Sequence, residues 1–185
     1  EEIEGARAMD FARAENARSL PQLQTDPRYA GLYAEALKIA TARDRIPTVG
    51  FAGDGAFRDF WQDAEHVRGV WRTTTVESYR SGTPAWRALL DLDALSKAEK
   101  ANWVWKGADC LPPDDHYCLV SLSNGGKDAV EVREFDTRTG LWVEGGFRLP
   151  EGKHRFEWID RDTLFLVTDW AKGDVTTSGY PFIAK

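Results

Sequence analysis

The feature that most constrains the fold of this chain is the repeated alternation of short apolar segments with tight polar turns. Residues 118–140, CLVSLSNGGKDAVEVREFDTRTG, contain an apolar run, a Gly-Gly break, an alternating run and a polar turn that ends in glycine. Short runs rich in Val, Phe, Trp and Thr, bounded by Gly, Asp and Pro, are typical of antiparallel strands joined by hairpins. The pattern therefore predicts a mainly β domain over 45–185.

The predicted strands fall into antiparallel groups of four. Two groups and the start of a third are expected. The first group has strands within 48–62, 69–75 and 85–91, and the second has strands at 102–111, 117–123, 128–136 and 141–145. The start of the third group has strands within 154–170 and 178–185. Four-stranded units that recur about every 45 to 60 residues are typical of β-propeller blades. A short helical turn is expected in the link at 92–100, where Ser96 and Glu99 have the spacing of a capping box.

The first 44 residues predict a helical segment that precedes the blades. A helix is expected over 1–20, with acidic residues in its first turn. The apolar residues that recur near one face of this helix are Ile3, Ala6, Phe11, Ala14 and Ala17. A second helix is expected from Asp26, as N-cap, with Pro27 at the first helical position. Both helices are amphipathic and carry no obvious chemistry, which favours a role in packing.

Charge and hydropathy exclude several classes of partner. The formal net charge is −6 and no Lys/Arg cluster is present, which argues against nucleic acid or an anionic membrane surface as a partner. No apolar run approaches the roughly 20 residues that span a bilayer. The chain begins without Met or a signal peptide, and the compartment stays open between cytoplasm and periplasm or secretion.

Two cysteines flank the turn-rich segment LPPDDHY. If residues 112–116 form the loop of a hairpin, Cys110 and Cys118 lie opposite each other on paired strands, within disulfide range. The favoured interpretation is nevertheless a pair of reduced, half-buried thiols, as a reducing cytosol would maintain, with the disulfide as the alternative. Metal binding is not expected, because two thiols without a nearby pair of histidines fall short of a zinc site.

No catalytic constellation, cofactor site or phosphate loop is expected in the chain. Ser121 and Ser123 lie in a strand context without the first glycine of a nucleophile elbow. The histidines, His66, His116 and His154, are scattered and lack metal spacing. A further cluster, in the segment DFWQDAEH, could form a cation site or a glycosidase pair but is more typical of a solvated loop: Asp59, Asp63, Glu65 and His66.

The order of these segments resembles the amino-terminal half of the prolyl oligopeptidase family of serine peptidases. LLDLDALS resembles the link between the first two blades of that family, and LVSLSNGGKDAVEVREFDTRTG resembles the hairpin of its second blade. Less specific likenesses are the helix within EEIEGARAMDFARAENARSL and the first blade within 45–75. Together the likenesses cover nearly the whole chain.

The resemblance implies helices followed by the first two to three blades of a seven-bladed propeller. In the family, the propeller covers an α/β-hydrolase domain that holds the Ser-Asp-His triad, and no position of this chain matches those residues. The resemblance thus implies a parent enzyme that hydrolyses short peptides, proline-containing ones among them, and a 185-residue chain that is itself inactive. The segments CLPPDDHYC and IDRDT depart from the family pattern, which indicates a distinct subgroup of the family.

Two further expectations depend on the incomplete blade. A chain that stops inside a blade is expected to belong to a longer protein, with the hydrolase domain as its partner. Its open edge would promote self-association through unpaired N–H and C=O groups. The alternative to the peptidase hypothesis is a freestanding binding module for peptide or carbohydrate, with a binding face that would use Trp61, Trp71 and Trp170.

Overall fold

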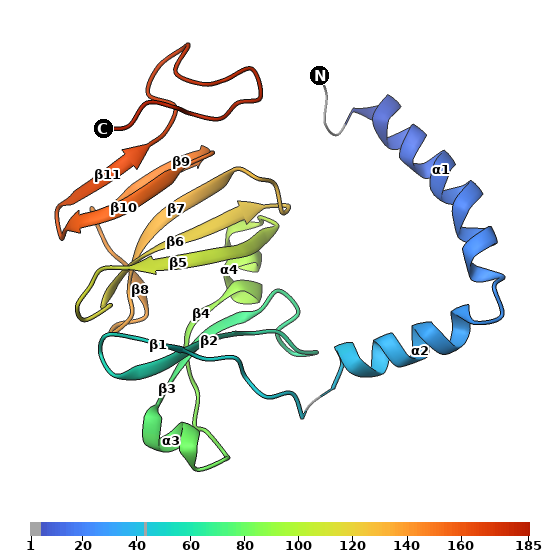
Figure 1. The fold of residues 1–185 in the computed structure, drawn as a ribbon, viewed down its shortest axis with the longest axis horizontal. Helices are drawn as coiled ribbons and strands as arrows, with labels where there is room; N and C mark the ends of the chain where they lie inside the picture. Colours follow the sequence, from blue (N-terminus) through green and yellow to red (C-terminus); the bar gives the residue numbers. More distant parts are fainter. Residues whose placement is uncertain (1–4, 43) are drawn as a thin grey trace. The chain divides into compact units, whose positions relative to one another are not determined.

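The structure is a computed structural model that describes residues 5–42 and 44–185. The chain divides into two compact units, residues 1–45 and residues 46–185. The first unit is helical and the second holds three antiparallel sheets (Figure 1). None of the helices in the described part of the chain is long and apolar enough to cross a membrane.

The helical unit consists of α1, Ala6–Gln24, and α2, Tyr29–Ala40. Helix α1 continues past the expected end at residue 20, through Pro21, and the predicted acidic first turn lies outside the described residues. The prediction that α2 begins at Asp26 was wrong, because Arg28 is the N-cap. Asp26 instead stabilises the turn before the helix, where its carboxylate accepts the Arg28 N–H at 2.9 Å.

The three sheets follow one another along the chain, as the sequence predicts. The strands are β1 Gly50–Phe51, β2 Ala56–Trp61, β3 Val70–Thr75 and β4 Arg87–Asp91 in the first sheet, β5 Trp103–Cys110, β6 Tyr117–Asn124, β7 Val130–Asp136, β8 Leu141–Trp142 and β9 Arg148–Gly152 in the second, and β10 Arg155–Asp160 and β11 Thr163–Val167 in the third. The first sheet has the order β1-β2-β3-β4 and the second begins β5-β6-β7. These described sheets form no closed ring, as expected for part of a propeller.

The last strand of the second sheet differs from the prediction of a single strand over 141–145. Strand β8 has two residues, and after a break at Gly145 and Gly146 strand β9 resumes pairing with β7. The break is held by Glu134 of β7, whose backbone N–H donates to the Phe147 carbonyl at 2.9 Å. The Glu134 carboxylate also accepts the Phe147 N–H at 2.8 Å, so a side chain replaces part of the strand ladder.

The hydrophobic core lies between the first two sheets. Its buried members come from β3, β4, the helix α4 (Leu92–Glu99), β5, β6 and β7: Trp71, Leu89, Leu90, Leu92, Trp103, Cys118, Val120, Leu122 and Phe135. Strand β6 is buried on both faces from residue 118 to residue 123, which explains why its sequence is an apolar run rather than an alternation. Strand β6 is therefore covered on both sides, as expected for a strand between neighbouring blades.

Two short helices flank the first sheet, α3 Val76–Arg80 and α4 Leu92–Glu99. Helix α3 follows β3 directly and was not predicted. The expected capping box in the link was wrong: Asp91 is the N-cap of α4 and accepts the Ala94 N–H at 3.0 Å. Ser96 therefore lies inside the helix rather than at its start.

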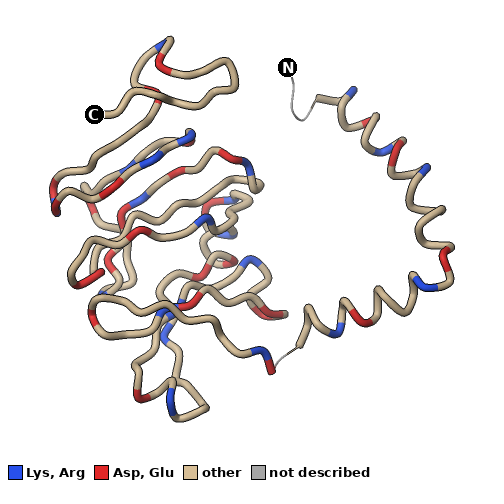
Figure 2. The backbone as a smooth tube through the Cα atoms, in the orientation of Figure 1, with Lys and Arg blue, Asp and Glu red and all other residues tan. Residues whose placement is uncertain are grey.

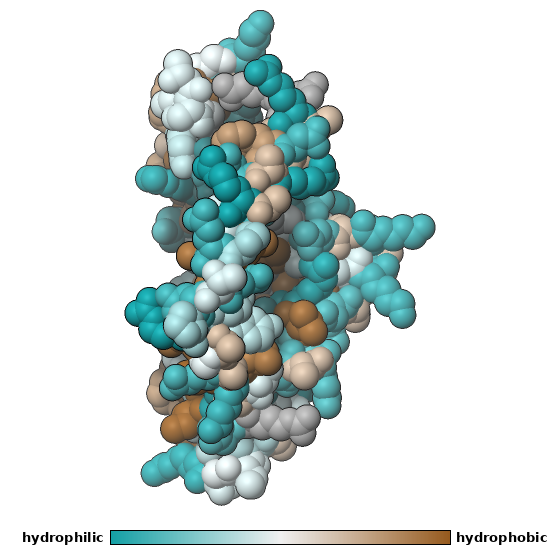
Figure 3. Space-filling model, turned by 90° about the vertical axis from the view of Figure 1, so that its right-hand side faces the viewer, coloured by the Kyte–Doolittle hydropathy of each residue, from teal (hydrophilic) through white to brown (hydrophobic). Residues whose placement is uncertain are grey.

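The third sheet is the hairpin of β10 and β11, with its turn at 160–162 as predicted. Ala184 forms a bridge to Val167, so the last residues begin to pair beside β11 without forming a named strand. Acidic and basic residues are interspersed along the part of the chain that the structure describes (Figure 2). On the face drawn in Figure 3, hydrophobic residues form separate patches between hydrophilic ones.

Candidate functional site

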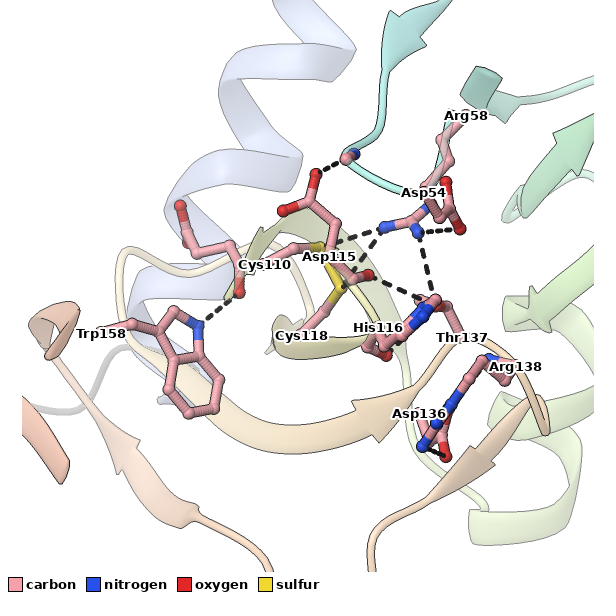
Figure 4. Close-up of a disulfide and its surroundings, with 12 residues drawn as sticks. Asp54, Arg58, Cys110, Asp115, His116, Cys118, Asp136, Thr137, Arg138 and Trp158 are labelled. Atoms are coloured by element: carbon pink, nitrogen blue, oxygen red, sulfur yellow. Dashed lines mark hydrogen bonds and ion pairs between the residues drawn. A yellow bond between two sulfur atoms is a disulfide. The ribbon is translucent and has the colours of Figure 1, made fainter. Parts of the chain in front are cut away.

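A polar site lies at the contact between the first two sheets, and we call it the interblade joint. We define it as Gly53, Arg58, the Cys110–Cys118 bridge, Asp115 and Thr137 (Figure 4). Arg58 lies on β2 of the first sheet, and the two cysteines lie on β5 and β6 of the second sheet. Asp115 lies in the turn between β5 and β6, and Thr137 directly follows β7. The joint therefore connects two turns that are about 60 residues apart in sequence.

Two turns meet at this joint. The Gly53 N–H donates to the Asp115 carboxylate at 2.7 Å. A methyl group on Gly53 would overlap the Pro113 carbonyl oxygen, so only glycine permits this approach. Asp115 itself has a left-handed backbone, with φ of 53°, which an aspartate tolerates better than most residues. The contact depends on both turns keeping these residue types.

The two cysteines lie opposite each other on β5 and β6, in the register that the sequence indicates. A disulfide joins them in the structure. Cys118 is fully buried, whereas Cys110 is half-buried. The bridge closes the turn at 111–117, which carries Asp115, and so ties both ends of the segment that contacts the first sheet.

Arg58 connects the bridge to both sheets. Its Nη1 lies 3.4 Å from the sulfur of Cys110 and 3.6 Å from that of Cys118. Its Nη2 donates to the Asp54 carboxylate at 2.9 Å and to the Thr137 hydroxyl at 3.4 Å. The Arg58 side chain is only 9% exposed, so Asp54 balances a charge that would otherwise be costly to bury.

A cavity of about 380 Å³ opens beside the joint. Its lining combines aromatic side chains with charged groups and one sulfur-bearing residue: Phe51, Arg58, Asp59, Phe60, Trp71, Trp105, Cys110 and Asp115. No serine, histidine or paired free carboxylates line it. Both lining carboxylates are engaged in structural contacts, Asp59 with Arg72 and Asp115 with the Gly53 N–H, so the contacts of this site hold the two sheets together.

A second polar layer reinforces the first sheet. Arg72 donates to Asp59 at 2.7 Å, and the Arg72 side chain is 12% exposed. The guanidinium also lies between two indole rings, 4.3 Å from the centroid of Trp61 and 4.1 Å from that of Trp86. This arrangement satisfies the buried carboxylate and adds cation–π attraction to two indole rings.

The acidic cluster of the segment DFWQDAEH does not assemble into a cation or glycosidase site. Asp59 pairs with Arg72, whereas Asp63 accepts the backbone N–H groups of Glu65 and His66 at 2.9 and 2.8 Å. The hydrogen bond from the His66 N–H, first among several, holds the pKa of Asp63 well below its usual range. The two carboxylates thus have separate structural roles, and the solvated-loop interpretation describes Asp63.

The other candidate residues are also dispersed. Ser121 and Ser123 are buried in β6, and the Ser123 hydroxyl donates to the Lys127 carbonyl at 2.9 Å. The ring nitrogens of His154 lie 2.8 Å from the Thr168 hydroxyl and 2.7 Å from the Pro150 carbonyl. His116 lies next to the joint, in the closed turn. Among the described residues, no group of three His, Cys, Asp or Glu side chains could hold a metal ion.

The three tryptophans considered for a binding face have different surroundings. Trp71 is 5% exposed and belongs to the core, where it contacts Trp105 and Phe135. Trp61 stacks on Arg72. Trp170 is 38% exposed, and its indole N–H donates to the Ile183 carbonyl at 3.0 Å. The structure therefore gives them no common face, and Trp71 is excluded as a surface residue.

Sequence reasoning did not identify Arg58, Thr137 or the contact between the turns. No local pattern joins residues that are 52 to 79 positions apart. The one available signal was the recurrence of acidic turn motifs at 53–55 and 113–115, which indicated equivalent turns but not that they touch.

Comparison with known proteins agrees with this architecture. Residues 1–182 match the family described as "Prolyl oligopeptidase, N-terminal beta-propeller domain". The chain is 52% identical, over 184 residues, to "Uncharacterized peptidase y4nA" of Sinorhizobium fredii, and 31% identical to "Uncharacterized peptidase RP174" of Rickettsia prowazekii. These matches cover 100% and 98% of the chain but 25% and 26% of the two relatives, so the chain spans about a quarter of their length.

Solved structures show the same likeness. A post-proline cleaving enzyme from Rickettsia typhi superposes with a TM-score of 0.85 and 30% identity, over 98% of this chain and 27% of that enzyme. A structure from a study of two prolyl endopeptidases superposes with a TM-score of 0.63 and 16% identity, over 91% of this chain and 24% of that one, which supports the fold alone. The chain belongs to the prolyl oligopeptidase family, in which it corresponds to part of the N-terminal β-propeller domain.

Proposed function

We propose that this chain is the amino-terminal part of a serine peptidase that hydrolyses short peptides. The observation that carries this proposal is the match of residues 1–182 to the propeller domain of prolyl oligopeptidases. Relatives that share the match are named peptidases, and one structural neighbour is named a post-proline cleaving enzyme. A preference for proline-containing peptides is the finer part of the proposal.

The role proposed for the sheets is to restrict access to a catalytic site elsewhere in the protein. A ring of blades admits a flexible peptide and excludes a folded protein if the blades stay fixed to their neighbours. Two features support blades that are fixed to their neighbours: strand β6 is buried on both faces, and the interblade joint connects the first two sheets. The chain's own residues would thus hold the shape of the entrance and take no part in bond cleavage.

The role proposed for the helices is to brace the hydrolase domain. They carry exposed hydrophobic residues that the helical unit does not bury itself: Phe11, Leu23, Leu32, Tyr33, Leu37 and Ile39. Apolar residues exposed at this density are typical of a surface that is covered by another part of a protein. A hydrolase domain is the partner that the family assignment suggests.

The experiment is a peptidase assay with a protein of the relatives' length that contains this chain. We expect hydrolysis of a short chromogenic peptide with proline before the scissile bond, and its loss after treatment with a serine-directed inhibitor. A matched peptide with alanine in place of proline tests the preference separately. Hydrolysis that resists the inhibitor would refute the serine mechanism, and equal rates for the two peptides would refute the prolyl preference.

The isolated 185-residue chain is expected to be inactive in the same assay. Peptide hydrolysis by the purified chain that the inhibitor abolishes would contradict this expectation. The binding-module alternative gains no support from the tryptophans, because Trp71 lies in the core.

A further inference from the structure

The two sulfurs of the bridge differ in their access to solvent. Cys110 is half-buried and lines the cavity of about 380 Å³, whereas Cys118 has no exposed surface. A disulfide is opened by a thiolate that attacks one sulfur and expels the other. Because the cavity reaches only Cys110 of the two, a small thiol that enters it meets that sulfur and leaves Cys118 as the expelled group.

The surroundings of Cys118 suit an expelled thiolate. The Arg58 guanidinium lies 3.6 Å from its sulfur, and Asp54 and Thr137 hold the guanidinium there through Nη2. Among the described residues, the buried Nε of Arg58 has no hydrogen-bond partner, so the group is not saturated. A cation at this distance favours a thiolate over a thiol, and a better-stabilised thiolate leaves faster.

We propose that the Cys110–Cys118 bridge is a site of thiol–disulfide exchange, attacked at Cys110 from the cavity by a small thiol, and that its opening loosens the interblade joint. In the first step the incoming thiolate bonds to the Cys110 sulfur, the bond between the two cysteines breaks, and Cys118 takes the electron pair as a thiolate beside Arg58. A second thiol then attacks the mixed disulfide and releases Cys110. The small thiol is oxidised to its disulfide and the protein gains two thiols.

The consequence for the joint follows from what the bridge closes. The turn at 111–117 places Asp115 against Gly53, and the bridge closes the base of this turn next to the hydrogen bond from the Leu111 N–H to the Tyr117 carbonyl. Arg58 contacts both sulfurs, so opening the bridge also removes one set of its partners. The contact between the first two sheets is thereby linked to the redox state of the cysteines.

The first test uses the wild-type protein in its natural length, without denaturant. It is incubated with reduced glutathione, quenched with N-ethylmaleimide and digested, and the adduct at each cysteine is measured by mass spectrometry. We expect the glutathione adduct on Cys110 and the maleimide on Cys118. Adducts mainly on Cys118, a bridge that glutathione does not open in the folded protein, or two cysteines that are already reduced in the oxidised preparation would overturn the proposal.

The second test measures the joint itself by hydrogen–deuterium exchange before and after reduction. We expect the Gly53 amide to exchange about tenfold faster in the reduced protein, as in local opening, while the amides of β3 are unchanged. Equal protection of Gly53 in both states would refute the link to the joint. Faster exchange throughout the sheets would refute a local effect.

Two variants at one position separate charge from packing. Arg58→Met removes the charge and keeps much of the side-chain volume, whereas Arg58→Lys keeps the charge. We expect reduction by dithiothreitol to be about tenfold slower in Arg58→Met and close to wild type in Arg58→Lys. Circular dichroism shows whether each variant is folded, and equal rates in two folded variants would overturn the role of Arg58.

Discussion

The contact between the turns can be tested by replacing Gly53 with alanine. The new methyl group would overlap the Pro113 carbonyl oxygen and lie 2.7 Å from the Pro113 carbonyl carbon, so one turn must move. The movement costs about 1 kcal/mol or more in strain. It also weakens the hydrogen bond from the Gly53 N–H to the Asp115 carboxylate, a bond to a charged group whose loss costs about 1.5 kcal/mol at a solvent-exposed site.

The sum predicts that Gly53→Ala lowers the free energy of unfolding by about 2.5 kcal/mol. For a protein of this size that corresponds to a fall in Tm of about 5 to 10 °C. Gly50→Ala is the matched control, because no atom lies within 4 Å of its added methyl group. Urea unfolding followed by tryptophan fluorescence measures both variants. Equal midpoints for the two would refute the contact between the turns.

Three further predictions concern other contacts. Arg72→Lys keeps the charge but loses the stacking on Trp61 and Trp86, so we expect a loss of about 1 to 2 kcal/mol in urea unfolding, and no loss would refute the cation–π contribution. Because the hydrogen bond from the His66 N–H lowers the pKa of Asp63 in the folded state, its stabilising effect is present above the ordinary aspartate pKa and is lost as pH falls below it. Asp63→Asn should therefore flatten the stability profile on the acid side, and an unchanged profile would contradict this. The open edge of the third sheet should cause concentration-dependent association in sedimentation velocity, and a single monomer peak at all concentrations would argue against it.

Much of the sheet structure could be predicted because it depends on local patterns. Short alternating or apolar runs bounded by turn residues specify β2, β3, β5, β6 and β7, and the hairpin pattern brings Cys110 opposite Cys118. These features depend on neighbours in sequence and on the period of two that a strand imposes.

Two wrong predictions of element boundaries, at the last strand of the second sheet and at the start of α4, come from side chains that replace backbone hydrogen-bond partners. Glu134 accepts the Phe147 N–H and so divides the expected last strand of the second sheet into β8 and β9. Asp91 caps α4 in place of Ser96 because it lies at the end of β4, where the helix begins. A side chain that takes a backbone role leaves no periodic signal.

The joint could not be predicted, because it depends on how two sheets pack. Arg58 resembles any charged residue of a strand, and only the packing of the second sheet buries it beside two sulfurs. Long-range contacts of this kind are set by the tertiary fold rather than by local propensity.

We proposed that the blades restrict access to a peptidase site, and the rate of hydrolysis as a function of substrate size tests this proposal most directly. A protein of the relatives' length that contains this chain is assayed with one cleavable sequence placed in peptides of increasing length and in an exposed loop of a folded protein. We expect rapid cleavage of the short peptides, a steep fall as length increases and no cleavage of the folded protein. Cleavage of the folded protein as fast as the short peptides would contradict the claim.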